Sequence, residues 1–413
     1  MAIDLEALYI DLHRHPELSF HETRTAAIVA QHLRELGFEV LEEVGRTGVV
    51  GVLRRPASGA SHGPVVWLRA DMDALPVQEQ TGLPYASTAV GINPEGITVP
   101  VMHACGHDMH VTALIGAAEQ LARDDADWRG TIVLIFQPAE ELGAGARAML
   151  DDGLLERVPR PDIVLGQHVT PLPVGTIGVR AGTQMSACDG ITVTMYGRGG
   201  HGSRPHSTID PVVMAASTIM RLQTVVSREI DPRDVAVVTV GAVRAGLKHN
   251  IIPTEARLEL SLRYPDEATR EKVISAVHRI VRAEALASGA ERDPDFETDH
   301  MLPATINDAA ATARVSTALN RALGEGTVID HGMHTGSEDV SWFARDAGVP
   351  LVFWFWGGVD AEQFRQAYEA GTFDSDIPTN HSPFFAPVIQ PTIDIGVRAL
   401  VAAAHEFLDT DRA

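Results

Sequence analysis

Cysteine, basic residues and long apolar runs are all scarce in this sequence. The 413 residues include two cysteines, Cys105 and Cys188, which excludes a disulfide framework and favours a compartment that keeps thiols reduced. The longest uncharged stretch, Ile163 to Val179, is interrupted by prolines and glycines, so it cannot form a membrane span of about 20 apolar residues. The first residues lack the basic and apolar segments of a secretory leader. We therefore expect a cytoplasmic protein that does not enter a membrane.

The charge balance argues against polyanionic partners. Acidic side chains number 55 against 33 basic ones, for a net charge of −22, which repels nucleic acid and anionic membrane surfaces. The composition, 45% apolar and 21% charged, is that of a globular protein, and the length predicts two or three domains. The 18 histidines stand out, because histidine is the commonest metal ligand.

The first 180 residues alternate between helical and strand patterns. Apolar residues at helical spacing predict helices at Glu22–Leu36 and Val111–Arg123. Continuous runs rich in valine, isoleucine and leucine predict strands at Gly48–Leu53, Val65–Leu68, Thr131–Phe136 and Ile163–Gly166. Such runs, separated by helices, are typical of strands buried on both faces of a mostly parallel α/β sheet.

From about Gly190 the order of elements changes to strand, helix, strand, strand, helix, strand. The predicted elements are Ile191–Tyr196, Asp210–Arg228, Val235–Val243, Ala256–Leu262, Asp266–Ala287 and a short strand near Phe296. This order is the split βαβ pattern of a ferredoxin-like α+β module. The α/β pattern then returns, with a helix at Ala309–Leu323 and a strand at Leu351–Trp356. We therefore predict an α/β domain with a mostly parallel mixed sheet (1–185 and 300–413), interrupted by an inserted ferredoxin-like domain (186–299).

Groups able to bind metal or transfer protons follow several predicted strands. They include Asp71, Asp73, Glu140, Glu141 and His168. In an open α/β sheet, ligands bind outside the carboxyl ends of the strands, so these side chains are expected to lie close together. The segment His103–His110 adds one thiol and three histidines just before a predicted helix.

Each of these residues has a simpler explanation when taken alone. An Asp or Glu after a strand is often the cap of the next helix, a single histidine is often a hydrogen-bonded core residue, and a single cysteine is often a small apolar one. A redox or nucleophilic Cys–His site would leave Glu140, Glu141 and His168 without a role. A hydrolytic site with two metal ions uses all of them, with a water held between ions about 3.5–4 Å apart. This ligand set suits zinc, manganese, cobalt or nickel.

The adjacent Glu140 and Glu141 are expected to point in different directions on a turn. One would bind metal, and the other would take the proton of the attacking water as general base.

At this point the sequence becomes recognisable. The motifs lie in one order along nearly the whole chain: Leu12–Ser19, Arg69–Pro76, His103–His110, Gln137–Glu141, Gly199–Gly202, His249–Pro253, Gly336–Asp339 and His381–Pro383. The chain resembles the dinuclear-metal aminoacylases, which include hippurate hydrolases, N-acyl-L-amino-acid amidohydrolases and auxin-conjugate hydrolases. The resemblance is most specific in the Cys-Gly-His-Asp core that begins at Cys105.

The resemblance implies a role for each matching position. It implies Glu140 as general base and a set of metal ligands, namely Cys105, His107, Glu141, His168 and His381, for two divalent ions per subunit. Asp71 and Asp73 occupy the place of a His-x-Asp ligand motif in the wider superfamily. Asp71 therefore either touches metal or supports the ligands. Asp73 and Asp108 are expected to support the ligands. Whether Cys105 bridges the two ions stays open.

The inserted domain carries further candidates. The resemblance implies that His201 reaches the active site of another subunit and stabilises the oxyanion, which requires a homodimer or a higher oligomer and makes the inserted domain a lid and dimerisation domain. Asn250 lies in a similarly placed loop, and the motif with Gly336 and Ser337 is assigned to substrate binding. Arg263, at a strand end, would either clamp the substrate carboxylate or be solvated. No phosphate loop is present at Gly197–Gly202, because the Lys-Ser/Thr ending is missing.

The leading hypothesis is hydrolysis of the amide bond in a small N-acyl or N-aroyl amino acid. A metallo-dipeptidase or carboxypeptidase on the same scaffold is the alternative, because its substrate also places an amide next to a free carboxylate. A non-catalytic metal-binding protein is a third hypothesis, against which the presence of Glu140 argues. The aromatic run Phe353–Trp356 is predicted to be a core strand in preference to an acyl pocket.

Overall fold

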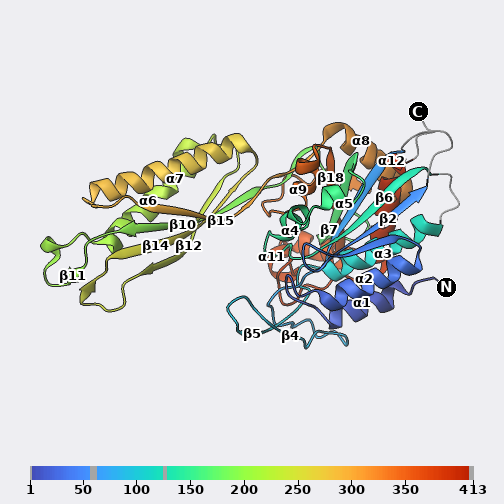
Figure 1. Cartoon of the computed structure of the whole chain (residues 1–413), viewed down its shortest axis with the longest axis horizontal. Helices are drawn as coiled ribbons and strands as arrows, with labels where there is room; N and C mark the ends of the chain where they lie inside the picture. The colour runs from blue at the N-terminus through green and yellow to red at the C-terminus, as the bar shows by residue number, and fades with distance from the viewer. Residues whose placement is uncertain (1, 56–62, 124–127, 409–413) are drawn as a thin grey trace. The chain divides into compact units, whose positions relative to one another are not determined.

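The computed structural model describes residues 2–55, 63–123 and 128–408. The chain divides into two compact units (Figure 1). The first comprises Met1–Gln184, Ile306–Gly332 and Asp339–Ala413, and the second comprises Met185–Thr305 and Met333–Glu338. The division differs from the predicted boundaries mainly in the short segment Met333–Glu338, which belongs to the second unit although it lies far beyond the inserted stretch.

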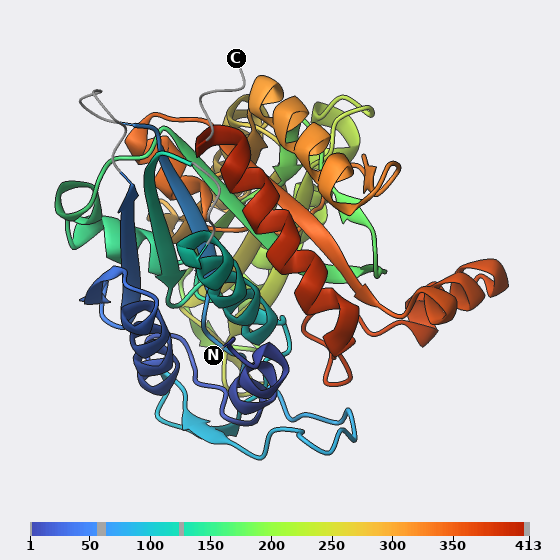
Figure 2. The ribbon, with the colours of Figure 1, turned by 90° about the vertical axis from the view of Figure 1, so that its right-hand side faces the viewer.

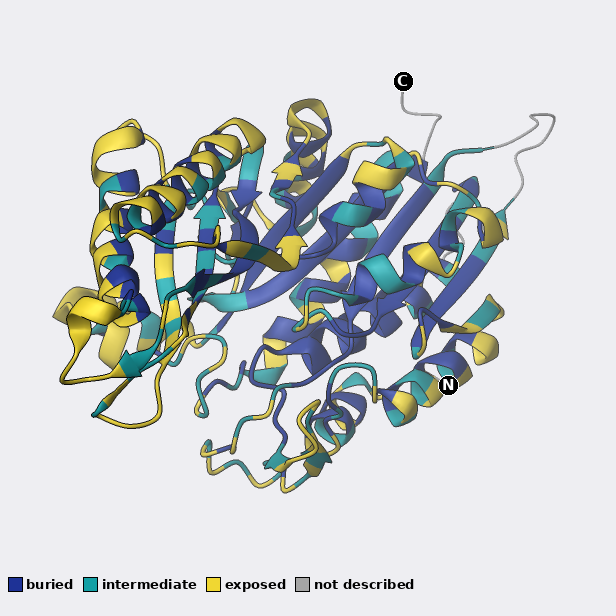
Figure 3. Cartoon of the chain, turned by 60° about the vertical axis from the view of Figure 1, so that its left-hand side comes forward, coloured by how far each residue is buried: buried dark blue, intermediate teal, exposed yellow. Residues whose placement is uncertain are grey.

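Eight strands among the described residues of the first unit form one mixed sheet. In spatial order they are β1 (Glu39–Val44), β2 (Gly48–Arg55), β6 (Gly130–Gln137), β3 (Val65–Asp71), β7 (Ile163–Pro173), β18 (Leu351–Val359), β8 (Ile177–Gly178) and β17 (Val328–Ile329). The central pairs β6–β3, β3–β7 and β7–β18 are parallel, whereas β1, β2 and β6 pair antiparallel. The parallel centre explains the continuous apolar runs, since both faces of these strands are buried (Figure 3).

Helices cover both faces of this sheet. One face packs against α1 (Leu5–Arg14), α2 (Thr23–Glu35), α3 (His107–Arg123), α8 (Ala309–Leu323) and α12 (Ile389–Leu408). Within this layer, α3 and α12 lie side by side across the sheet (Figure 2). The opposite face packs against α4 (Gly145–Asp151), α5 (Leu154–Arg157) and α9 (Ser341–Ala347), where Trp67 of β3 contacts Phe343 edge-on.

Two elements extend beyond the residues that the sequence predicted. Helix α3 begins at His107, four residues before the predicted start at Val111. Its first turn is polar yet fully buried, so apolar periodicity could not reveal it. Strand β7 continues to Pro173. His168 therefore lies within the strand, whereas the sequence predicted it to lie after the strand's end.

The second unit is the ferredoxin-like α+β module. Its elements are β10 (Ala187–Tyr196), α6 (Pro211–Glu229), β12 (Val237–Ala245), β14 (Glu255–Tyr264), α7 (Glu267–Ala287) and β15 (Asp295–Leu302). The strands pair antiparallel in the order β12-β14-β10-β15. Asp210 and Asp266 cap the two helices through their side chains, as the predicted helix starts require. The predicted fold class is therefore confirmed.

Short elements complete the description. They are β4 (Val90–Ile92), β5 (Thr98–Pro100), β9 (Gly182–Met185), β11 (Gly200–His201), η1 (Pro205–Ser207), β13 (Ile251–Ile252), β16 (Thr305–Asn307), α10 (Ala361–Ala370) and α11 (Phe373–Asp376). The aromatic run Phe353–Trp356 is buried in β18, as predicted for a core strand. None of the described helices is long and apolar enough to cross a membrane.

Candidate metal centre

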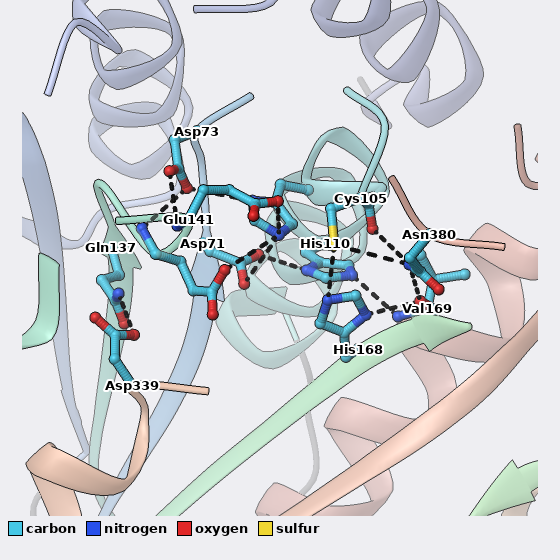
Figure 4. A network of polar contacts seen from close by, with 12 residues as sticks. Asp71, Asp73, Cys105, His110, Gln137, Glu141, His168, Val169, Asp339 and Asn380 are labelled. Carbon is cyan, nitrogen blue, oxygen red and sulfur yellow. Dashed lines mark hydrogen bonds and ion pairs between the residues drawn. The ribbon is translucent and has the colours of Figure 1, made fainter. Parts of the chain in front are cut away.

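The carboxyl ends of neighbouring parallel strands bring the polar groups of the first unit together. Asp71 is the last residue of β3 and pairs with Gln137, the last residue of β6. His168 comes from β7 on the other side of β3, and α3 begins at His107 beside them. Figure 4 shows the resulting cluster, with Cys105, Asp71, Glu141 and His168 around one centre.

Asp73 organises the middle of this cluster. Its two carboxylate oxygens accept the backbone N–H groups of Glu140 at 3.1 Å and Glu141 at 3.0 Å. One of the same oxygens lies 3.2 Å from Nδ1 of His107, and Ser19 donates its hydroxyl to the other at 2.6 Å. The Asp73 contact places the proton on Nδ1 of His107, which leaves the lone pair of Nε2 free for a cation.

Two buried polar atoms at this centre have no hydrogen-bond partner. They are Nε2 of His107 and Oε1 of Glu141, which lie 3.8 Å apart. A carboxylate oxygen of Glu140 lies 3.9 Å from the same Nε2 atom. Unpaired buried polar atoms are costly, so their convergence fits a bound ion, and imidazole with carboxylates is a donor set that divalent transition metals accept. The residues present therefore fit a divalent metal site.

Cys105, His168 and His381 extend the cluster on one side. The ring of His168 donates Nδ1–H to the carbonyl oxygen of Val169 at 2.7 Å, which turns its Nε2 atom toward the Cys105 sulfur at 3.4 Å. His381 has a left-handed backbone with φ of +72°, and its N–H binds the carbonyl oxygen of Ala104. Its Nε2 atom lies 3.4 Å from Glu141.

His110 belongs to the same cluster but is excluded as a ligand by its hydrogen bonds. The backbone N–H of Val169 donates to Nε2 of His110 at 3.0 Å, so that nitrogen carries no proton. The other nitrogen, Nδ1, then holds the proton and donates it to Asp71. Both nitrogens are therefore occupied, and burial lowers the pKa of His110, which keeps the ring neutral.

Asp71 is held by its neighbours in an ionised state. Burial alone would raise its pKa, but Arg69, 2.7 Å away, together with His107 and His110, holds the pKa of Asp71 well below its usual range. The oxygen that Arg69 binds also lies 3.6 Å from Nε2 of His107. Asp71 is thus a fixed negative charge beside the unpaired imidazole nitrogen.

The electrostatics of the cluster favour a cation. Burial disfavours the charged imidazolium of His107, yet the surrounding carboxylates Asp71, Asp73 and Glu141 raise its pKa to about 10. Burial and the negative charge of Asp73 raise the pKa of Glu141 to about 8, against the opposing effect of His107. Burial, followed by the negative charges of Glu141, Glu140 and Asp71, raises the pKa of the Cys105 thiol. The carboxylates around His107 thus leave an excess of negative charge that a divalent ion would balance.

The adjacent carboxylates converge, in contrast to the prediction that they point apart. Both Glu140 and Glu141 reach within 4 Å of Nε2 of His107. The reason is the turn that carries them: Ala139 has a positive φ of +49°, and Asp73 binds the next two N–H groups from one side. Two long side chains on such a turn can meet at one point.

A buried network beneath this turn was not assigned a role from the sequence. Asp339 accepts the N–H of Ala146 at 2.9 Å, and its other oxygen lies 2.6 Å from the amide nitrogen of Gln137 and 3.2 Å from Arg69. Asn380 similarly donates to the carbonyl oxygens of Cys105 and Val169. Buried amides and carboxylates that hold other segments in place do not recur at a fixed spacing along the chain. The sequence alone therefore could not distinguish them from solvent-exposed polar residues.

Asp108, predicted to support the ligands, turns to a different partner. Its hydrogen bonds go to Nδ1 of His13 at 2.7 Å and to the N–H of Met109. The other nitrogen of His13 lies 3.1 Å from Glu79. Asp108 therefore fixes the first turn of α3 against α1.

The remaining predicted residues lie in the second unit. His201 of β11 accepts the N–H of Ser203 on Nδ1 at 3.1 Å, so Nε2 carries the proton and is exposed as a donor. Asn250 lies beside it, because its carbonyl oxygen accepts the N–H of Gly202. Arg263 donates to Ser337 at 3.0 Å and to the carbonyl oxygen of Thr335, next to Gly336, which explains why the segment Met333–Glu338 belongs to this unit.

Known proteins resemble the whole chain. A family model described as Peptidase family M20/M25/M40 matches residues 67–381. A hippurate hydrolase of Campylobacter jejuni is 40% identical over 346 residues, 83% of this chain and 85% of that protein. Thermostable carboxypeptidase 1 of Saccharolobus solfataricus is 38% identical over 401 residues, 96% of this chain and 92% of that protein.

Solved structures agree with these relatives. The crystal structure of a dinuclear metal-binding peptidase of the M20 family from Bacillus subtilis covers 98% of each chain, with a TM-score of 0.78 and 31% identity. The predicted class of enzyme, a metal-dependent hydrolase of amide bonds, is confirmed by this kinship. The chain belongs to peptidase family M20/M25/M40.

Proposed function

We propose that this chain hydrolyses the amide bond of small N-acyl or N-aroyl amino acids, with Glu140 as general base. One observation carries the proposal: the Glu140 carboxylate lies 3.9 Å from the unpaired Nε2 atom of His107, at the edge of the ligand cluster. A base in that position can take a proton from a water next to the cluster. The similarity to a hippurate hydrolase supports an acyl conjugate as substrate.

The proposed ligands are five side chains whose atoms face the centre: Cys105, His107, Glu141, His168 and His381. They would hold two divalent ions, for which zinc, manganese, cobalt and nickel are the candidates. Such ions, when bound, lower the pKa of water and polarise the carbonyl of the substrate. Asp73 supports the set by orienting His107 and the turn of Glu140 and Glu141.

Proton transfer is assigned to the chain itself. Glu140 accepts a proton from the attacking water and returns it to the nitrogen of the departing amino acid. Its backbone is fixed by Asp73, so the carboxylate stays within reach of both positions. A glutamine at this position would keep the shape of the side chain and remove the base.

The second unit is proposed to recognise the substrate. His201 donates Nε2–H to the oxyanion, and it does so in the active site of another subunit, so the enzyme is a homodimer or a higher oligomer. Arg263, supported by Ser337, binds the free carboxylate, while Asn250 and Gly336 line the same substrate site. We place the protein in the cytoplasm, where the thiol of Cys105 stays reduced.

The decisive experiment is a substrate panel with metal-reconstituted protein. Release of amino acid would be measured from benzoyl, acetyl, long-chain acyl and indoleacetyl amino acids, with dipeptides alongside. We expect at least about a tenfold higher kcat/KM for one acyl class than for any dipeptide, a difference of about 1.4 kcal/mol in transition-state binding.

A preference for dipeptides would support the alternative, a metallo-dipeptidase or carboxypeptidase, which the similarity to a carboxypeptidase favours. Absence of turnover on the whole panel, with metal bound, would leave only the hypothesis of a non-catalytic metal-binding protein. The three outcomes are therefore distinguishable in one assay.

A further inference from the structure

Glu22 is a fully buried carboxyl group outside the ligand cluster. It immediately precedes α2, and its side chain is 0% exposed. One oxygen accepts the backbone N–H groups of Phe20 and Ala139, both at 2.9 Å, and the other accepts the hydroxyl of Thr47. All three of these partners are neutral donors. Burial of a carboxyl group is costly, so its contact with a distant turn calls for an explanation.

Ala139 is the residue of that turn with an unusual backbone. Its φ of +49° lies in the left-handed region, which is unfavourable for a non-glycine residue unless other contacts compensate. The residue is completely buried, so its N–H needs a partner inside the protein. The carboxyl group of Glu22 is that partner.

Three successive N–H groups of the turn are held by carboxyl groups from elsewhere in the chain. Glu22 binds the N–H of Ala139, and Asp73 binds those of Glu140 and Glu141. On the other side, the carbonyl oxygen of Ala139 accepts the N–H groups of Ala144 and Gly145 at 3.3 and 3.1 Å. The peptide groups of Ala139 therefore anchor both ends of the turn.

We propose that Glu22 is a positioning residue that holds Ala139 in its left-handed conformation and thereby aims the carboxylates of Glu140 and Glu141 at the metal centre. The inference rests on the proposed function and deepens it, because it names a residue that acts through the general base and a ligand without touching either. The turn requires a hydrogen-bond acceptor at the distance that the Glu22 side chain reaches. It does not require the negative charge of Glu22. This distinction gives the test.

The test compares three variants of the full-length, metal-reconstituted enzyme. Glu22→Gln keeps an oxygen for Phe20 and Ala139 and offers N–H to the Thr47 hydroxyl, so we expect kcat within about threefold of the wild type. Glu22→Ala frees the turn, and a displacement near 1 Å costs about a hundredfold in kcat. KM should stay within about threefold, because substrate contacts are unchanged.

Glu17→Ala is the matched control, because Glu17 also precedes α2 and contacts its first turn. Glu17 caps α2 at the N–H groups of Arg24 and Thr25, but it does not reach Ala139. If Glu22 worked only by stabilising α2, both alanine variants would lose thermal stability and kcat together. We expect Glu17→Ala to lower the Tm and leave kcat within about twofold, since the variant loses a helix cap and leaves the turn at Ala139 untouched.

Two kinetic results would overturn the proposal. One is a folded Glu22→Ala protein with wild-type kcat; the other is a Glu22→Gln protein whose kcat falls more than about tenfold, because charge and not geometry would then matter. Should Glu22→Ala fail to fold, Glu22→Asp, one methylene too short to reach Ala139, takes its place with the same expected loss. The isosteric glutamine variant tests the proposal in either case.

Metal affinity separates a failure of this inference from a failure of the proposed function. Titration with Zn²⁺ followed by calorimetry needs no turnover. We expect about tenfold weaker binding in Glu22→Ala than in the wild type, because the orientation of Glu141 is lost, and unchanged binding in Glu17→Ala. If the wild type hydrolyses nothing on the panel, this comparison still tests the role of Glu22, and equal affinities would refute it.

Discussion

Asp73 and His107 are joined by a contact of 3.2 Å between a carboxylate oxygen and Nδ1. The same carboxylate binds the N–H groups of Glu140 and Glu141, so one side chain orients an imidazole and two carboxylates at once. Asp73→Asn would keep the size but replace one acceptor oxygen by an amide nitrogen. We expect metal affinity to fall about 10- to 100-fold, as for other partners of metal ligands, which titration calorimetry would measure.

The adjacent glutamates should respond differently to the same substitution. Glu140→Gln is expected to bind metal normally and to lose at least about a hundredfold in kcat, because the base is removed. Glu141→Gln should lose metal, measured by elemental analysis after dialysis. Turnover at the wild-type rate in Glu140→Gln would refute its assignment as general base.

Metal removal should be reversible. Dialysis against a chelator is expected to abolish amide hydrolysis, and addition of zinc, manganese, cobalt or nickel should restore it. Cys188→Ala, which changes the other thiol, serves as a control and should behave like the wild type. If activity survived complete chelation, Cys105 would have to be considered as a nucleophile.

The catalytic role that we propose for His201 in another subunit predicts complementation. Glu140→Gln and His201→Ala should each be inactive alone, but subunits exchanged between them restore one complete site in each mixed dimer. Random mixing then returns about a quarter of the wild-type activity. Mixing that restores no activity, although mass spectrometry detects the mixed dimers, would place His201 and Glu140 of a working site on the same chain.

His13 predicts how stability changes with pH. Burial lowers its pKa, but hydrogen bonds to Asp108 and Glu79 outweigh burial and raise the pKa from 6.5 to about 9. The charged form is therefore favoured by folding, and its contribution, about 3 kcal/mol, is complete below pH 6.5 and is lost as the pH rises through about 9.

Chemical unfolding at several pH values would measure this effect. The difference in the free energy of unfolding between the wild type and His13→Gln should shrink toward high pH. His15→Gln, at the end of the same helix, is the control, because that side chain is half exposed. A difference that stays constant from about pH 6 to about pH 10 would exclude the charged pair.

Gly106 separates Cys105 and His107, two of the proposed metal ligands, and has a backbone conformation that favours glycine. Its φ is +84°, and a Cβ atom would lie 2.5 Å from Val169. The backbone strain of Gly106→Ala alone should lower the free energy of unfolding by about 1–3 kcal/mol. The contact with Val169 should add to this loss and weaken metal binding. Gly82→Ala is the control, since its φ is +72° with open space around it, and it should show the backbone cost alone. Equal effects would mean that the contact with Val169 is unimportant.

The fold could be predicted well because its elements follow simple patterns. The buried parallel strands appear as apolar runs, and the helices Ala309–Leu323 and Glu267–Ala287 follow aspartates that cap them. Errors occurred where polar residues are buried. The first turn of α3 and the middle of β7 carry His107 and His168, and a polar residue in a buried element looks like a loop residue.

The candidate site was predictable as a set of residue types but not as a geometry. The cluster of thiol, imidazole and carboxylate groups is visible in the sequence, and the structure brings its members in the first unit together. Which nitrogen of His110 is occupied, or that Glu22 reaches Ala139, depends on contacts between segments more than 50 residues apart. Spacing along the chain carries no information about such contacts.

The pairing of β9 with β16 has a consequence for how the second unit is joined to the chain. Strand β9 ends at Met185, where the inserted stretch begins, and β16 begins at Thr305, where that stretch ends. The two strands are neighbours in a two-stranded sheet, so the chain leaves the first unit and returns to it at adjacent points. A stretch whose two ends are hydrogen-bonded neighbours leaves the strand order of the large sheet unchanged, and Met333–Glu338 alone joins the second unit from a later part of the chain.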